Sequence, residues 1–205
     1  MKTRTERTSQ TDPLRIDEVQ AVDAGGVVGL TFCPGKQGDS MTGPPWARDL
    51  ETDLDAIARW RPAAMLTLIE DHEFEMLGVP QLGERVRARG IAWHHLPIVD
   101  LQAPDERFES LWVERGPGLV GLLREGGRVL VHCRGGLGRA GTVAGLMLVE
   151  LGVAGEEAVR RVRGRSRLRS NCGTSFIDEP DRSRADSGRS IAAICDGSVP
   201  IASFG

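Results

Sequence analysis

One segment, residues 129–142, constrains the fold more than any other part of the chain. It opens with the apolar run Val129–Val131, reaches His132 and Cys133, passes through a turn with three glycines, and becomes an apolar, helix-like stretch at Arg139. A strand that enters a helix through a tight turn is typical of sheets in which strands and helices alternate. Such sheets bind ligands beyond the carboxyl ends of their strands. The segment therefore predicts an α/β fold with a ligand site at Cys133.

The turn after Cys133 has the composition of an anion-binding loop. Glycine allows positive φ, so successive backbone N–H groups can turn inward and bind an anion. The start of the following helix adds its positive end, and Arg139 can offer two parallel N–H donors to two phosphoryl oxygens. The same groups favour the thiolate form of Cys133. The predicted phosphate-binding residues are Arg134, Gly135, Gly136, Leu137, Gly138 and Arg139.

The pattern His132-Cys133-x5-Arg139 resembles the signature of the cysteine-dependent protein tyrosine and dual-specificity phosphatases. Stretches 29–36, 77–80 and 93–100 also resemble the kinase-associated phosphatase group of that family, and the likeness covers about residues 20–163. It implies a central, mostly parallel sheet flanked by helices. It also implies that phosphate monoesters are hydrolysed through a phosphocysteine intermediate, with no metal or organic cofactor.

The resemblance assigns a role to each signature residue. Cys133 would be the nucleophile, Arg139 would hold the phosphoryl oxygens, and His132 would order the loop by hydrogen bonding. Asp100 would protonate the leaving oxygen, a step that needs a general acid. The rival acid is Asp105, but an Asp that follows Pro and precedes Glu-Arg-Phe is better explained as the N-cap of a helix.

Two features depart from the family pattern. Ala140 stands where many members have Ser or Thr, whose hydroxyl helps to expel the thiolate from the phosphoenzyme. Thr142 lies roughly 200° around the helix from it and is no obvious substitute. A downstream Gln that positions water has no match. Slow dephosphorylation would follow, and a phosphate-binding pseudophosphatase, a small-molecule phosphatase and a sulfur-transfer or arsenate-reducing enzyme stay open as alternatives.

Three further groups have a functional and a plain structural interpretation. The acidic run 70–73 could face the substrate, but we expect a solvated loop. Lys36 could favour the approach of phosphate, or be a surface lysine in a turn. His94 and His95 point to opposite faces of a strand, so we expect no metal site.

Composition limits the partners. With 205 residues, of which 40% are hydrophobic, a single domain is expected. The net charge of −3 gives no global basic field for nucleic acid, and no apolar stretch approaches the roughly 18 residues of a membrane span. The four cysteines lack zinc spacing, and no secretory signal is visible, so we expect a cytoplasmic protein. Its partner would be a phosphoprotein or a small phosphate ester; the oligomeric state stays open.

The chain divides into three parts. We expect a flexible N-terminus over 1–20, a phosphatase domain over 21–168, and a polar, disordered or atypical tail over 169–205, where a changed reading frame is the alternative. Helix 106–124 is expected to be interrupted or kinked at Gly116-Pro117-Gly118. The other predicted strands cover 26–33, 63–69, 91–98 and 128–132, and the other predicted helices cover 49–60, 81–89, 139–151 and 155–163.

Overall fold

The computed structural model describes residues 6–21, 25–40 and 43–165. Its main sheet has five strands in the order β1-β2-β7-β5-β6, and only β1 is antiparallel to its neighbour. This mostly parallel sheet with flanking helices confirms the predicted α/β fold. The five strands are β1 (Asp17–Gln20), β2 (Val27–Phe32), β5 (Ala64–Thr67), β6 (Ala92–His95) and β7 (Arg128–Cys133).

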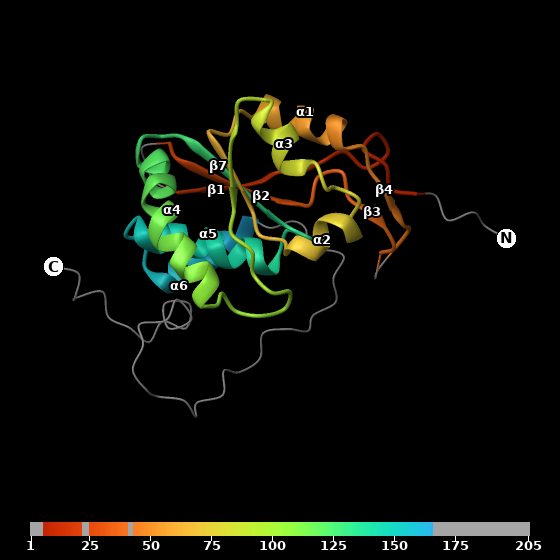
Figure 1. Ribbon diagram of the computed structural model, residues 1–205. Coiled ribbons are helices and arrows are strands. Elements are labelled where there is room, and N and C mark those ends of the chain that lie inside the picture. The colour runs from red at the N-terminus through yellow and green to blue at the C-terminus, as the bar shows by residue number, and fades with distance from the viewer. Residues whose placement is uncertain (1–5, 22–24, 41–42, 166–205) are drawn as a thin grey trace.

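Helices cover both faces of the sheet (Figure 1). On one face lie α1 (Leu50–Trp60) and α3 (Leu82–Arg87), which bury Ile57 and Val86 against Met65 and Leu130 of the sheet. The other face is covered by α4 (Glu106–Arg124), α5 (Gly138–Glu150) and α6 (Gly155–Arg165).

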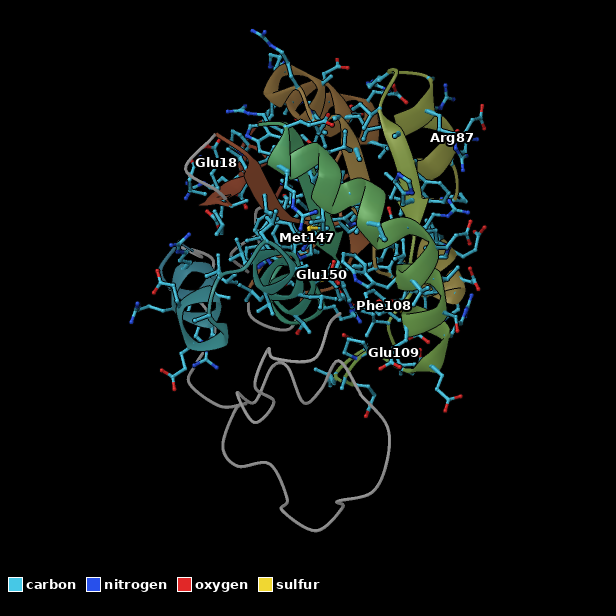
Figure 2. All side chains as sticks on the ribbon, turned by 90° about the vertical axis from the view of Figure 1, so that its left-hand side faces the viewer. Glu18, Arg87, Phe108, Glu109, Met147 and Glu150 are labelled. Carbon is cyan, nitrogen blue, oxygen red and sulfur yellow. The ribbon has the colours of Figure 1, made fainter. Side chains whose placement is uncertain are left out.

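The helices α4 and α5 pack together over the sheet. Figure 2 looks onto this side, where Phe108 of α4 and Met147 of α5 are both fully buried. Trp112 Nε1 of α4 donates a hydrogen bond of 2.6 Å to Glu150 Oε1 at the end of α5. The apolar faces of two helices that are separated in the chain by β7 thus close one side of the core.

Local sequence explains where the elements begin. Asp49 caps α1 by accepting a hydrogen bond from the Thr52 N–H at 2.7 Å, and Asp105 caps α4 by accepting from the Phe108 N–H at 3.0 Å. The second contact confirms the N-cap predicted for Asp105. The buried run of β7 begins with the apolar residues Val129–Val131, as expected for a central strand covered on both faces, and His132 is its polar member.

Two expectations need correction. Residues 6–20 were expected to be flexible, but Asp17–Gln20 pairs with β2, and Arg7 packs 3.5 Å from the centroid of the Trp46 ring. Helix α4 was expected to be interrupted at Pro117, yet it is one element. Pro117 leaves the carbonyl of Val113 without its helical donor. Val113 is 78% exposed, so water can take that donor's place.

Two small elements complete the described part of the chain. The hairpin β3 (Gln37–Gly38) and β4 (Trp46–Ala47) lies at the same end of the molecule as α2 (Asp71–Met76) (Figure 1), and the Gln37 N–H donates to the Leu77 carbonyl at 2.9 Å. The predicted tail, 169–205, lies outside the described residues. Over the residues that are described, no helix is both long enough and apolar enough to span a membrane.

Candidate active site

The candidate site lies at the carboxyl ends of the parallel strands. Cys133 is the last residue of β7 and stands in register with Phe32 of β2, while His132 stands in register with Thr67 of β5. Helix α2 follows β5, and the loop that contains Asp100 follows β6. Three connections thus converge at one edge of the sheet, which is where ligands are expected in such folds.

The loop between β7 and α5 curls over the sulfur of Cys133. Gly136 has φ of +78°, and its N–H donates to Cys133 Sγ at 3.2 Å. A Cβ at Gly136 would lie 2.7 Å from the Phe32 nitrogen, so both its backbone angle and its close approach to β2 require glycine. By contrast, a Cβ at Gly135 or Gly138 would meet no atom within 4 Å.

Arg139, in the first turn of α5, is only 5% exposed. Both of its terminal nitrogens donate to Glu73, with Nη2 at 2.9 Å from Oε1. Nη1 also donates to the Ile98 carbonyl at 3.1 Å, and Nη2 lies 3.1 Å from Asp100 Oδ1. The guanidinium is therefore held by α2 and by the loop after β6, while no hydrogen bond occupies Nε within the described part of the chain.

Glu73 corrects the expectation of a solvated acidic loop. Residues 71–76 form α2, and Glu73 is 1% exposed. Burial would raise the pKa of Glu73, but hydrogen bonds from Arg139 and from the Glu70 N–H outweigh it and lower the pKa. Likewise, burial would lower the pKa of Arg139, but the hydrogen bonds to Glu73 and the nearby negative charges raise it. Both groups are thus held in their charged forms.

Asp100 is the most accessible of the three charged residues Glu73, Asp100 and Arg139. Its side chain is 45% exposed and ends beside Arg139. The Asp100 N–H donates to Glu70 Oε2 at 3.3 Å, and its own Oδ1 accepts from the Leu101 N–H at 3.1 Å. Leu101 is 86% exposed and has φ of +61°, an unusual backbone angle for a branched residue. The Asp105 carboxylate instead accepts a hydrogen bond from the Phe108 N–H at the start of α4.

His132 is fully buried beneath the loop. Burial lowers its pKa to about 3, so the ring is neutral at physiological pH. The Thr67 hydroxyl accepts from Trp93 Nε1 at 2.8 Å and lies 2.8 Å from His132 Nε2. Because a hydroxyl has one proton and two lone pairs, Thr67 can contact both groups at once, and the tautomer of His132 decides whether Thr67 or His132 is the donor between them.

Three further polar residues near this edge of the sheet make contacts inside the protein. Lys36 is not a surface lysine, since it is only 6% exposed and its Nζ lies 3.3 Å from the Arg134 carbonyl. Cys33 is buried on the α1–α3 side of the sheet, where burial raises the pKa of its thiol. His95 stacks on Trp93 and donates to the Ile69 carbonyl at 2.8 Å.

Two positions after the loop bear on the departures from the family pattern. Ala140 is fully buried and offers no hydroxyl. The Thr142 hydroxyl donates to the Gly138 carbonyl at 3.2 Å, one turn earlier in α5. Across residues 6–21, 25–40 and 43–165, no group of three His, Cys, Asp or Glu residues is arranged to hold a metal ion.

Comparison with known proteins agrees with this geometry. The model of the family described as PTP-SAK, the Swiss Army Knife protein DSP-PTPase phosphatase domain, matches residues 48–185, which is more than half of the chain. The chain therefore belongs to this family of dual-specificity and protein tyrosine phosphatase domains, as its signature loop predicted.

Two similar relatives are named cyclin-dependent kinase inhibitor 3. The Rattus norvegicus protein is 34% identical over 112 residues, which are 52% of this chain and 51% of the relative. The Mus musculus protein is 28% identical over 136 residues, which are 64% of this chain and 63% of the relative. The chain thus spans between half and two thirds of the length of these relatives.

Solved structures support the fold. Kinase associated phosphatase, with its catalytic site cysteine replaced by serine, superposes with a TM-score of 0.64 at 24% identity, over 75% of this chain and 84% of that one. Tk-PTP in its active form gives a TM-score of 0.52 at 30% identity, over 72% of this chain and 85% of that one. Both belong to the fold class that the sheet and loop define.

Proposed function

We propose that this chain hydrolyses phosphate monoesters on phosphotyrosine or phosphoserine/threonine proteins through a phosphocysteine intermediate. The observation that supports the proposal is the convergence of the Cys133 thiol, the Arg139 guanidinium and the Asp100 carboxylate at one edge of the sheet. The phosphatase domain family and the name of the kinase-linked relatives favour a phosphoprotein substrate.

In the first step, Cys133 Sγ attacks phosphorus in line with the leaving oxygen. The S–P bond forms as the P–O bond breaks, and Asp100 gives its proton to the departing oxygen. The equatorial oxygens are held by Arg139 and by the inward N–H groups of residues 134–138, so catalysis is mainly positional and electrostatic.

Binding of phosphate involves an exchange at Arg139. Glu73 occupies the donors on one side of the guanidinium. The donors that remain for phosphoryl oxygens are the Nε hydrogen and the Nη2 hydrogen that faces Asp100. An arriving phosphoryl oxygen takes the place of the Asp100 carboxylate. Asp100, which is 45% exposed, is then free to turn toward the leaving oxygen.

In the second step, water attacks the phosphocysteine. Asp100 accepts a proton from the water, the O–P bond forms, and the S–P bond breaks to return the thiolate. Neutral His132 keeps the loop ordered through Thr67. With Ala140 in place of a hydroxyl residue, expulsion of the thiolate lacks one donor, so we expect this step to limit turnover.

A catalytically impaired phosphate-binding module is the second candidate. The buried methyl group of Ala140 favours it, since the hydroxyl that many family members use is absent. For both candidates we propose a cytoplasmic location, because a cysteine stays reduced there. The two candidates differ in whether an aryl phosphate is turned over.

The deciding experiment compares Cys133→Ser with Cys33→Ala. Cys33 is a matched control because its side chain packs in the opposite core cluster, and because its backbone N–H, which contacts the Arg134 carbonyl, is kept in Cys33→Ala. Wild type and Cys33→Ala should hydrolyse p-nitrophenyl phosphate and phosphopeptides, and acid quenching should trap a labelled phosphoenzyme. Cys133→Ser should lose turnover but still bind phosphate. Turnover by Cys133→Ser well above background would remove Cys133 from the nucleophile role.

A further inference from the structure

Lys36 is a buried cation with no carboxylate partner. It is 6% exposed, and within the described ranges no Asp or Glu lies within ion-pair distance of it. Buried charges are normally paired, because an isolated ammonium in a low dielectric is costly. The buried Arg48 nearby shows the usual arrangement, since it pairs with Asp53 at 2.8 Å. The counter-charge of Lys36 must therefore come from a group other than a carboxylate.

Two aromatic rings direct the Lys36 side chain toward the signature loop. Nζ lies 3.9 Å from the centroid of the Trp46 ring and 4.4 Å from that of Phe32. It ends 3.3 Å from the carbonyl of Arg134, the residue that follows Cys133. Burial lowers the pKa of Lys36 to about 8, while the negative charges that Cys33 and Cys133 can carry oppose this shift.

The contact with Arg134 fixes the orientation of one peptide unit. The same carbonyl also accepts from the Cys33 N–H at 3.4 Å, so two donors hold it from the β2 side. The described peptide bonds are all trans, and in a trans peptide the C=O and the following N–H point in opposite directions. The Gly135 N–H is therefore turned away from Lys36 and from the Cys33 N–H.

We propose that Lys36 is a positioning residue for the reaction. Its ammonium holds the Arg134–Gly135 peptide so that the Gly135 N–H faces the phosphoryl group, and its charge is the counter-charge of the Cys133 thiolate. This role rests on the proposed function. Other titratable groups near the thiol are Arg139, which is balanced by Glu73 and Asp100, neutral His132, and Cys33. Two further cations lie near Lys36 at the Trp46 ring: Arg48, which is paired with Asp53, and Arg7.

The test replaces Lys36 with Met, which keeps the length of the side chain and removes the charge. Arg7→Gln is the matched control, because Arg7 packs against the same Trp46 ring but makes its hydrogen bonds to Pro44 and Ser40 and not to the loop. Alkylation of Cys133 by iodoacetamide is followed from pH 5 to 9 by peptide mass spectrometry. Phosphatase activity and thermal unfolding are measured on the same samples.

For Lys36→Met we expect the midpoint of the alkylation profile to rise by about one pH unit. We expect kcat/KM to fall about tenfold or more, mainly through kcat, while Arg7→Gln stays near wild type. Lys36→Arg should recover part of both effects. A purely structural lysine would instead lower the melting temperature and leave the alkylation profile of the folded protein in place.

An alkylation profile of folded Lys36→Met that matches wild type would overturn the proposal. If Lys36→Met does not fold, Lys36→Gln provides the same comparison. If wild type itself shows no turnover, the proposed function fails, but the alkylation profiles still decide whether Lys36 acts on the Cys133 thiol.

Discussion

Replacing Glu73 with Gln should destabilise the protein and weaken phosphate binding together. Glu73 and Arg139 are 1% and 5% exposed, so the substitution leaves a buried guanidinium without its main counter-charge. Breaking a buried pair costs about 3–5 kcal/mol. The Gln side chain keeps one acceptor and nearly the same volume, and Arg139 keeps Asp100 and the Ile98 carbonyl. We therefore expect a loss of about 2–3 kcal/mol, or roughly 5–10 °C in melting temperature.

The pH dependence of that loss follows from the lowered pKa of Glu73. An acid whose pKa is lowered by folding stabilises the protein above its unfolded pKa, and this contribution disappears as pH falls through the folded pKa. The difference in unfolding free energy between wild type and Glu73→Gln should thus have its maximum value at pH 6–7. It should begin to shrink below about pH 4.5, where the unfolded carboxyl takes up a proton.

Urea denaturation at a series of pH values measures this difference, and phosphate binding is measured by calorimetry at pH 7. Glu75→Gln is the matched control, because Glu75 lies on the same helix and is exposed. We expect phosphate affinity to fall about tenfold in Glu73→Gln, since the fork of Arg139 loses its support. The reasoning is refuted if Glu73→Gln is as stable as Glu75→Gln, or if its deficit is unchanged at pH 3.

Two other substitutions test the proposed chemistry. Arg139→Lys keeps the charge but removes the planar fork, so kcat/KM should fall about 100-fold or more in a steady-state assay, and a near-normal value would exclude bidentate binding. Asp100→Asn should slow alkyl phosphates, which have poor leaving groups, by about 10–100-fold, and should affect p-nitrophenyl phosphate far less. Equal losses on both substrates would point to Asp105 or to a structural role for Asp100.

The sequence allowed the loop between Cys133 and Arg139 to be located because its parts are contiguous. The strand, the glycine turn and the helix that present Cys133 and Arg139 lie within one short segment, so local patterns were enough. The same holds for Asp105, whose capping contact reaches only three residues along the chain. The strand, the helix and the N-cap depend on short-range chemistry, and the structure contains all three.

Glu73 and Lys36 could not be placed in this way. Glu73 meets Arg139 across 66 residues, and Lys36 meets Arg134 across 98 residues. An acidic run such as 70–73 has the composition of a solvated loop, and only the packing of α2 against the loop shows that one of its carboxylates is buried. A usable signal was the pair Glu70 and Glu73, whose spacing forms a capping box directly after a buried strand.

The charges of the assembled site indicate how the binding of phosphate could change the contacts of Arg139 and Asp100. Arg139 is neutralised by Glu73 on one side and by Asp100 on the other, so the guanidinium offers little net charge to an anion until Asp100 moves. The remaining positive potential comes from the loop N–H groups, the start of α5 and Lys36, which has no carboxylate partner in the described part of the chain. In the proposed mechanism, the arrival of phosphate therefore both fills the loop and releases the acid. Substrate binding and the movement of Asp100 toward the leaving oxygen are then coupled, because phosphate and Asp100 compete for the same Nη2 hydrogen of Arg139.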